Sequence, residues 1–236
     1  MSSPIGTTRN YNESVAQAER ISGFLSKTYG WMAIGLGITA VVAMLVAGSP
    51  ATQAFFFGNA IARWGLFLVT LGMVWYISAR VNDLAPGTAA LLFAIYAALM
   101  GAMLSGIFLL YTGSSIATTF VTTAGMFGAL ALYGTVTRRN LAGVGQFAFM
   151  GLIGVVIASI VGIFWHNSML QFVISVCGVV VFTGLTAWDA QRLKAMALAL
   201  PDGRAGSYAI AGALALYLDF INLFLFLLRL FGGRRD

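Results

Sequence analysis

The sequence predicts an all-α, polytopic membrane protein with seven transmembrane helices. Of its 236 residues, 60% are hydrophobic and 8% are charged, whereas about 25% of the residues in a soluble domain are charged. So little polar surface cannot cover a water-soluble globule of this size. The apolar residues form long runs without the alternation of a membrane β-barrel, and an isolated segment in lipid satisfies its backbone only as a helix.

Seven apolar segments reach the length of about 20 residues that a bilayer requires. They cover residues 27–48, 61–81, 87–110, 114–136, 143–165, 168–195 and 206–230. The stretch 54–60 either lengthens the second helix or lies at the membrane interface. The sixth helix is expected to continue beyond the hydrocarbon until the Pro-Asp-Gly sequence at 201–203 ends it. The short connections predict one seven-helix membrane domain, 27–236, after a polar cytoplasmic N-terminal tail, 1–26.

The basic residues predict the orientation of the bundle. With seven spans, the N-terminus lies on the same side as the second, fourth and sixth connections. That side carries Arg9, Arg20, Lys27, Arg80, Arg138, Arg139, Arg192, Lys194 and Arg204, and the other side carries Arg63, Arg229, Arg234 and Arg235. Because cytoplasmic loops are enriched in Lys and Arg, we expect a cytoplasmic N-terminus and an external C-terminus. A six-span arrangement with a re-entrant last segment would reverse the side of the C-terminal tail.

Two pairs of small residues predict close contacts between helices. Gly101 and Ser105 in the third helix, and Ala124 and Gly128 in the fourth, are each four residues apart on one helical face. This spacing lets helix backbones approach closely in membranes. We interpret both pairs as packing positions without chemistry.

Two acidic residues interrupt the last two apolar runs. Asp219 lies in the middle of the seventh, where an ionised carboxylate facing lipid would cost roughly 2.5–3.5 kcal/mol. It is therefore expected to face protein or a water-filled cavity, which predicts that the seventh helix lies inside the bundle. Asp189 lies near the end of the sixth run, where Arg192 and Lys194 follow it.

The two acids are expected to meet at one depth in the membrane. Asp189 lies 13 residues before Asp202 in the connecting loop, and Asp219 lies 17 residues after it. At about 1.5 Å per residue these offsets differ by about 6 Å, which an asymmetric loop can absorb. Thr186 and Asn222 add polar groups on the same helical faces. Two carboxylates this close cannot both ionise easily, so the pair predicts a pH sensor.

Arg80, at the end of the second helix, is a candidate cation for this pair. It lies on the same membrane side as the loop between helices six and seven, and an ion pair with a deprotonated aspartate would act as a latch that protonation releases. In the alternative interpretation, Arg80 and Asp83 are ordinary interfacial residues, and Arg80 extends towards lipid headgroups. The bare sequence favours neither.

At these residues the chain resembles the Bax inhibitor-1 (transmembrane Bax inhibitor motif) family, and most closely its bacterial branch. The likeness runs from about residue 20 to the end. The motifs that carry it are Leu216-Tyr217-Leu218-Asp219-Phe220-Ile221-Asn222-Leu223-Phe224, Leu227-Leu228-Arg229-Leu230-Phe231-Gly232, Thr186-Ala187-Trp188-Asp189, Thr28-Tyr29-Gly30-Trp31-Met32, Thr123-Ala124-Gly125-Met126-Phe127-Gly128 and Tyr133-Gly134.

The resemblance implies a central seventh helix surrounded by the first six, in the bacterial inner (plasma) membrane. It also implies a pH-sensitive calcium leak governed by two aspartates, which match Asp189 and Asp219. Ca²⁺ is then the transported ion, and the two carboxylates are its expected ligands. The family's helix-two arginine matches Arg80. Some members carry an acid earlier in that helix, and this sequence has none between Arg63 and Arg80.

Other classes of protein fit less well. A rhodopsin needs a lysine in the membrane centre, and Lys27 and Lys194 both lie outside it. An intramembrane hydrolase needs an activated His or Cys, and we expect His166 and Cys177 to be inert. The basic residues are spread over the loops, so a nucleic-acid partner is not expected. No phosphate-binding loop or zinc-ligand spacing appears in the sequence, so no enzymatic cofactor is expected either. The remaining alternative is a non-transport regulator that binds other membrane proteins, such as a membrane-bound AAA protease, through tail 1–26.

Overall fold

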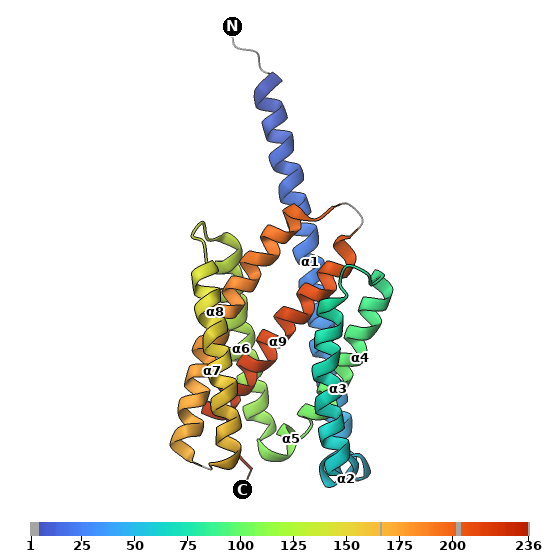
Figure 1. The fold of residues 1–236 in the computed structure, drawn as a ribbon, viewed down its shortest axis with the longest axis vertical. Helices are drawn as coiled ribbons and strands as arrows, with labels where there is room; N and C mark the ends of the chain where they lie inside the picture. Colours follow the sequence, from blue (N-terminus) through green and yellow to red (C-terminus); the bar gives the residue numbers. More distant parts are fainter. Residues whose placement is uncertain (1–4, 166, 202–203, 236) are drawn as a thin grey trace.

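The computed structural model describes residues 5–165, 167–201 and 204–235, and this part of the chain is largely helical (Figure 1). The helices are α1 (Ile5–Ala47), α2 (Pro50–Gly58), α3 (Ala60–Ala79), α4 (Pro86–Leu104), α5 (Ile107–Leu110), α6 (Gly113–Val136), α7 (Ala142–Phe164), α8 (Ser168–Ala199) and α9 (Ala205–Phe231). Within the described ranges, seven spans are long and apolar enough to cross a membrane: α1, α3, α4 with α5, α6, α7, α8 and α9. The predicted fold class is confirmed.

The first helix is much longer than its apolar run. It starts at Ile5 and continues without a break through residue 26 to Ala47. Figure 1 shows its N-terminal part, in dark blue, projecting well beyond the other helices. Most of the predicted polar tail is therefore a helical extension of the first span, and residues 1–4 lie outside the described residues.

The stretch 54–60 does not lengthen the second span, and the alternative that it lies at the membrane interface stays a prediction. Residues 50–58 form the separate helix α2, at the end of the bundle opposite the N-terminus (Figure 1). The Asn59 side chain accepts hydrogen bonds from the backbone N–H groups of Ile61 and Ala62, at 2.9 and 3.3 Å. Asparagine favours this capping position, so the chain turns at Asn59 and starts α3 there.

The last helix, α9, is the centre of the bundle. In its most apolar stretch 72% of the residues are buried, against 11% in α3 and 17% in α7. It packs against α1, α3, α4, α6 and α8, whereas α7 packs chiefly against α8. The prediction of a central last helix is confirmed. The expectation that all six other spans surround it holds for five, because α8 separates α7 from α9.

Helices approach each other closely where small residues face the neighbouring helix. Of the two predicted pairs, only the one that contains Gly101 lies at such a contact. A Cβ atom at Gly101 would lie 2.6 Å from the Thr39 carbonyl oxygen of α1, so α4 and α1 can approach only with glycine there. A Cβ atom at Gly128 would have no neighbour within 4 Å. The prediction that Ala124 and Gly128 form a helix contact is wrong, because that face of α6 borders an open fissure.

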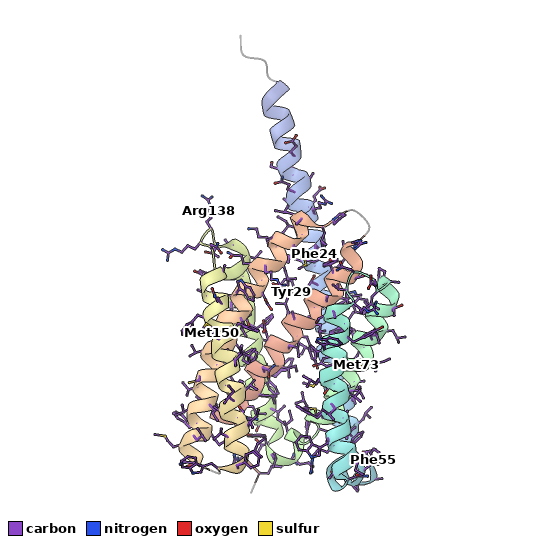
Figure 2. All side chains as sticks on the ribbon, in the orientation of Figure 1. Phe24, Tyr29, Phe55, Met73, Arg138 and Met150 are labelled. Atoms are coloured by element: carbon purple, nitrogen blue, oxygen red, sulfur yellow. The ribbon has the colours of Figure 1, made fainter. Side chains whose placement is uncertain are left out.

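The chain termini lie at opposite ends of the bundle (Figure 1). Figure 2 shows Arg138, in the connection between α6 and α7, at the end nearest the N-terminus, and Phe55 of α2 at the other end. We call these the N-terminal end and the C-terminal end of the bundle. The uneven distribution of basic residues follows from this arrangement, since the α3–α4, α6–α7 and α8–α9 connections share the N-terminal end.

Candidate functional site

Asp219 lies in the middle of α9 with 5% of its surface exposed. Its neighbours on the helix fix its direction. The Tyr217 hydroxyl is 2.7 Å from Thr39 Oγ1 on α1, and the Phe220 ring packs edge-on against Phe127 of α6, with centroids 5.5 Å apart. Residues two apart lie on nearly opposite sides of a helix. Asp219 is therefore turned away from Tyr217 and its contact with α1.

Asp189 is half-buried on α8, the helix that packs most closely along this side of α9. Its carboxyl group comes within hydrogen-bonding reach of the Asp219 carboxyl group. Oδ2 of Asp219 is buried and has no hydrogen-bond partner among the described residues. The structure thus brings the two predicted acids together and leaves one buried oxygen open for a proton or a cation.

This arrangement has a clear electrostatic consequence. A buried carboxylate without compensating charge or hydrogen bonds is costly, and two carboxylates in contact repel each other strongly in a medium of low dielectric constant. The pair can lower this cost by sharing a proton or by binding a cation. The titration of such a site belongs to the pair rather than to either residue.

Arg192 supplies the positive charge that acts on Asp189. It lies one helical turn further along α8, and its guanidinium carbon is 5.5 Å from the centre of the Trp188 ring. The side chain is exposed at the N-terminal end of the bundle. Sequence reasoning missed this role, although the spacing of an acid and a base at i and i+3 on a helix is a signal for it.

Arg80 is not in contact with the acidic pair in this structure. It follows the last residue of α3, and its Nη1 atom donates to Asp83 Oδ2 at 3.1 Å. The two side chains are 61% and 64% exposed, because both lie at the α3–α4 turn. A latch formed by Arg80 would need the guanidinium to leave Asp83, so that role stays a prediction.

Thr186 and Asn222, the predicted supporting polar residues, are hydrogen-bonded to their own helices. The fully buried Thr186 donates from Oγ1 to the Phe182 carbonyl at 2.7 Å, and Asn222 donates from Nδ2 to the Leu218 carbonyl at 2.8 Å. Each bond satisfies a side-chain donor inside the bundle. The Asn222 oxygen is then the group on α9 best suited to assist Asp219 with a cation or water.

Two residues just beyond Asp189 connect α8 to the end of α6 and to the α6–α7 connection. Gln191 accepts from the Leu141 N–H through Oε1 and donates to the Arg139 carbonyl through Nε2, both at 2.8 Å. Lys194 donates from Nζ to the Thr135 carbonyl at the end of α6, at 2.7 Å. The sequence offered no signal for these contacts, because they depend on where the α6–α7 connection lies in space.

The site does not contain a ready-made cage for a metal ion. Among the described residues, no three His, Cys, Asp or Glu side chains gather closely enough to hold one. Cys177 is a free, exposed thiol, and His166 lies outside the described residues. The carboxylate oxygens of Asp189 and Asp219 suit a hard cation. Two carboxylates are too few to bind such an ion tightly, so they suit weak and transient binding.

Comparisons with known proteins agree with the motifs noted in the sequence. The family model described as "Inhibitor of apoptosis-promoting Bax1" matches residues 21–236. The inner membrane protein YbhL of Escherichia coli K12 is 46% identical over 229 residues, covering 95% of this chain and 97% of the relative. An uncharacterized protein of Borreliella burgdorferi is 44% identical over 90% of this chain and 93% of its own length. The protein RP147 of Rickettsia prowazekii, also uncharacterized, is 40% identical over 98% of this chain and 97% of its own length. The chain therefore belongs to the Bax inhibitor-1 family.

Proposed function

We propose that this chain is a pH-sensitive cation leak channel of the bacterial inner membrane that conducts Ca²⁺ and is gated by the Asp189–Asp219 pair. The observation that carries the proposal is the contact between the two carboxyl groups of α8 and α9, with the buried Oδ2 of Asp219 lacking a hydrogen-bond partner within the described part of the chain. A membrane-embedded acid is expensive and is functional by default. The inner membrane location is supported by the printed name of the Escherichia coli relative, and the basic N-terminal end supports a cytoplasmic N-terminus.

The gate would work through the cations near the pair. At higher pH the deprotonated carboxylates are held by positive charge, from Arg192 in the described arrangement and from Arg80 in a state where it has left Asp83. As the pH falls, a proton binds to the pair and weakens this hold, so the N-terminal end can loosen. Binding of one proton changes the free-energy difference between the closed and open states by at most about 1.4 kcal/mol per pH unit. A complete switch from 1:99 to 99:1 needs about 5.5 kcal/mol, so we expect a graded response.

A pocket at the C-terminal end supports an outer entrance for ions. Its volume is about 310 Å³, and it is lined by Leu227 and Phe231 of α9 and by five hydroxyl side chains of α6: Ser114, Ser115, Thr118, Thr119 and Thr122. Such oxygen atoms can replace part of the water around a cation. Between this pocket and Asp219, α9 has the buried apolar side chains Leu223 and Phe224, so we infer that the described state is closed.

Calcium flux into proteoliposomes across a pH series tests the proposal. Wild-type protein should leak more as the pH falls, and Asp219→Asn and Asp189→Asn should each abolish this pH response. Glu19→Gln makes the same kind of change on the exposed part of α1 and should keep the wild-type response. A pH response that survives in both aspartate variants would contradict the gating role of the pair.

The projecting part of α1 favours a second candidate function, a non-transport regulator of other membrane proteins such as a membrane-bound AAA protease. Residues 13–20 are exposed on a helix that extends past the bundle (Figure 1), and an exposed polar helix can present side chains to a partner. Deleting residues 2–18 separates the two functions, since transport should survive the deletion and partner binding should not. Retained binding of the protease by the shortened protein would exclude this use of α1.

A further inference from the structure

A fissure runs along the side of the bundle between α1 and α6. Both helices pack on α9, and the space between them has a volume of about 490 Å³. Phe220 of α9 contributes to its wall, together with α1 residues between Leu25 and Leu36 and α6 residues between Phe120 and Thr135. The lining is almost entirely apolar, so this is a cavity for a hydrocarbon group rather than for an ion.

The fissure exists because the α6 face that borders it consists of small residues. Ala124, Gly128 and Ala131 are four and three residues apart on that face, and all three line the space. Gly128 is exposed, and a Cβ atom there would meet nothing within 4 Å. No other helix of the described chain packs against Gly128, and the small residues leave space for a molecule from outside the protein.

One end of the fissure is polar and carries a positive charge. The hydroxyl groups of Tyr29 on α1 and Thr135 on α6 lie close to each other, and the Thr135 hydroxyl donates to the Ala131 carbonyl at 2.8 Å. The half-buried Lys194 reaches the same place, where its Nζ atom donates to the Thr135 carbonyl. Figure 2 shows Tyr29 in the half of the bundle nearest the N-terminus. An ammonium group and two hydroxyls thus lie where the apolar space approaches one membrane surface.

We propose that the fissure binds one acyl chain of an anionic phospholipid, with the lipid phosphate held by Lys194. The volume of about 490 Å³ is within the usual range of roughly 300–1,000 Å³ for small-molecule sites. Basic groups between membrane helices are known recognition elements for anionic headgroups. The proposal is independent of the channel function and concerns the leaflet at the N-terminal end.

Photo-crosslinking in nanodiscs tests the position of the acyl chain. The probe is phosphatidylglycerol with a diazirine in one acyl chain, and the labelled peptides are mapped by mass spectrometry. Labels should concentrate on residues 25–36 and 120–135. Gly128→Leu fills the fissure and should reduce this labelling at least about fivefold, because it displaces methylenes of the chain from their apolar site. Gly125→Leu is the matched control, since Gly125 also has open space around it but does not line the fissure.

Equal labelling in Gly128→Leu and wild-type protein would overturn the proposal. Labels spread evenly over the lipid-facing sides of α3 and α7 would also overturn it, because they would show ordinary contact with the bilayer. Thermal unfolding of both glycine variants in detergent checks that they fold, and the ratio between the two variants remains informative if both are slightly destabilised.

The headgroup is tested with the same probe on two lipids. Phosphatidylglycerol should label the fissure several-fold more than a phosphatidylcholine of the same acyl chains. Lys194→Gln should remove this preference and Lys194→Arg should retain it, because only the latter keeps the charge. Equal labelling by the two lipids in wild-type protein, or a preference that survives Lys194→Gln, would contradict the role of Lys194.

Discussion

The two ends of the bundle are closed in different ways. At the N-terminal end the contacts include side chains that bind backbone groups. Gln191 and Lys194 bind the end of α6 and the connection after it, and Ser207 donates to the Leu84 carbonyl at 2.7 Å. At the C-terminal end the ties include backbone pairs between the start of α6 and the C-terminal tail. The Thr112 N–H donates to the Gly233 carbonyl at 3.1 Å, and the Arg235 N–H donates to the Leu110 carbonyl at 3.0 Å.

This difference indicates which end can respond to the acidic pair. Gln191 and Lys194 lie two and five residues after Asp189 on one rigid helix, so a shift of α8 at the pair moves both ties. The hydrogen bonds of residues 110–112 with 233–235 are made by main-chain groups, and they do not involve α8. We therefore expect a pH-driven opening at the N-terminal end and a nearly unchanged C-terminal end.

The largest expected effect comes from overpacking the contact between α6 and α8. A Cβ atom at Gly134 would overlap the backbone carbonyl of Ala187, which cannot move aside as a side chain could. Gly134→Leu should lower the free energy of unfolding by about 3 kcal/mol, the upper end of usual overpacking costs. Thermal unfolding in detergent measures this, with Gly125→Leu as the control that should change stability little. Equal stability of the two variants would contradict the tight contact.

A smaller effect is expected from the side-chain ties. Gln191→Ala leaves the Arg139 carbonyl and the Leu141 N–H without their partner and should cost about 2 kcal/mol. Ser115→Ala at the C-terminal end removes one acceptor, that of the Gly233 N–H, and should cost about 1 kcal/mol. Hydrogen exchange should rise at residues 138–142 in the first variant alone. A rise at both ends in Gln191→Ala would show that the two ends are not independent.

A fall in pH is expected to loosen only the N-terminal end of the bundle. If one proton on the pair loosens the N-terminal end, exchange at residues 138–142 should rise by at most about tenfold per pH unit as the pH falls, after correction for the intrinsic pH dependence of exchange. Exchange at residues 110–112 and 233–235 should show no such excess. Asp219→Asn should remove the excess at 138–142. The same excess in that variant would assign the pH response to another group.

The smallest expected effects come from the two arginines. Removing the positive charge of Arg192 makes ionisation of the pair less favourable, so Arg192→Gln should move the midpoint of the leak to higher pH. Arg192 is exposed and screened, and the shift should be less than about one pH unit. If Arg80 acts as a latch in another state, Arg80→Ala should raise the leak at neutral pH. An unchanged leak in Arg80→Ala would exclude the latch, and Arg80 would then have only the role of a surface ion pair with Asp83.

Much of the fold follows from the chain's apolar runs, because a bilayer demands helices of a minimum length. The central position of α9 could be predicted from Asp219, since a carboxylate inside an apolar helix must face protein. The contact of Asp219 with Asp189 could be anticipated from their offsets around one loop. These inferences needed only distances along the chain.

The parts that could not be predicted depend on positions in space. Ala124 and Gly128 have the spacing of a helix contact, yet they border a fissure. The helices α1 and α6 both pack against α9 and leave this space between them. Arg80 was assigned to the pair by its membrane side and by the family resemblance, whereas in the structure it pairs with Asp83, three residues away in the same α3–α4 turn. Gln191 reaches a connection 50 residues earlier in the sequence, which no local pattern indicates.

The central claim is that protons and calcium compete for the Asp189–Asp219 pair. The most direct test is the pH midpoint of calcium leak in proteoliposomes, measured at several calcium concentrations. Calcium binds the deprotonated carboxylates, so a higher calcium concentration should move the midpoint to lower pH, with a Hill slope near one for a single proton. A midpoint that is indifferent to calcium would contradict the account, because it would place the ion's binding site away from the two aspartates.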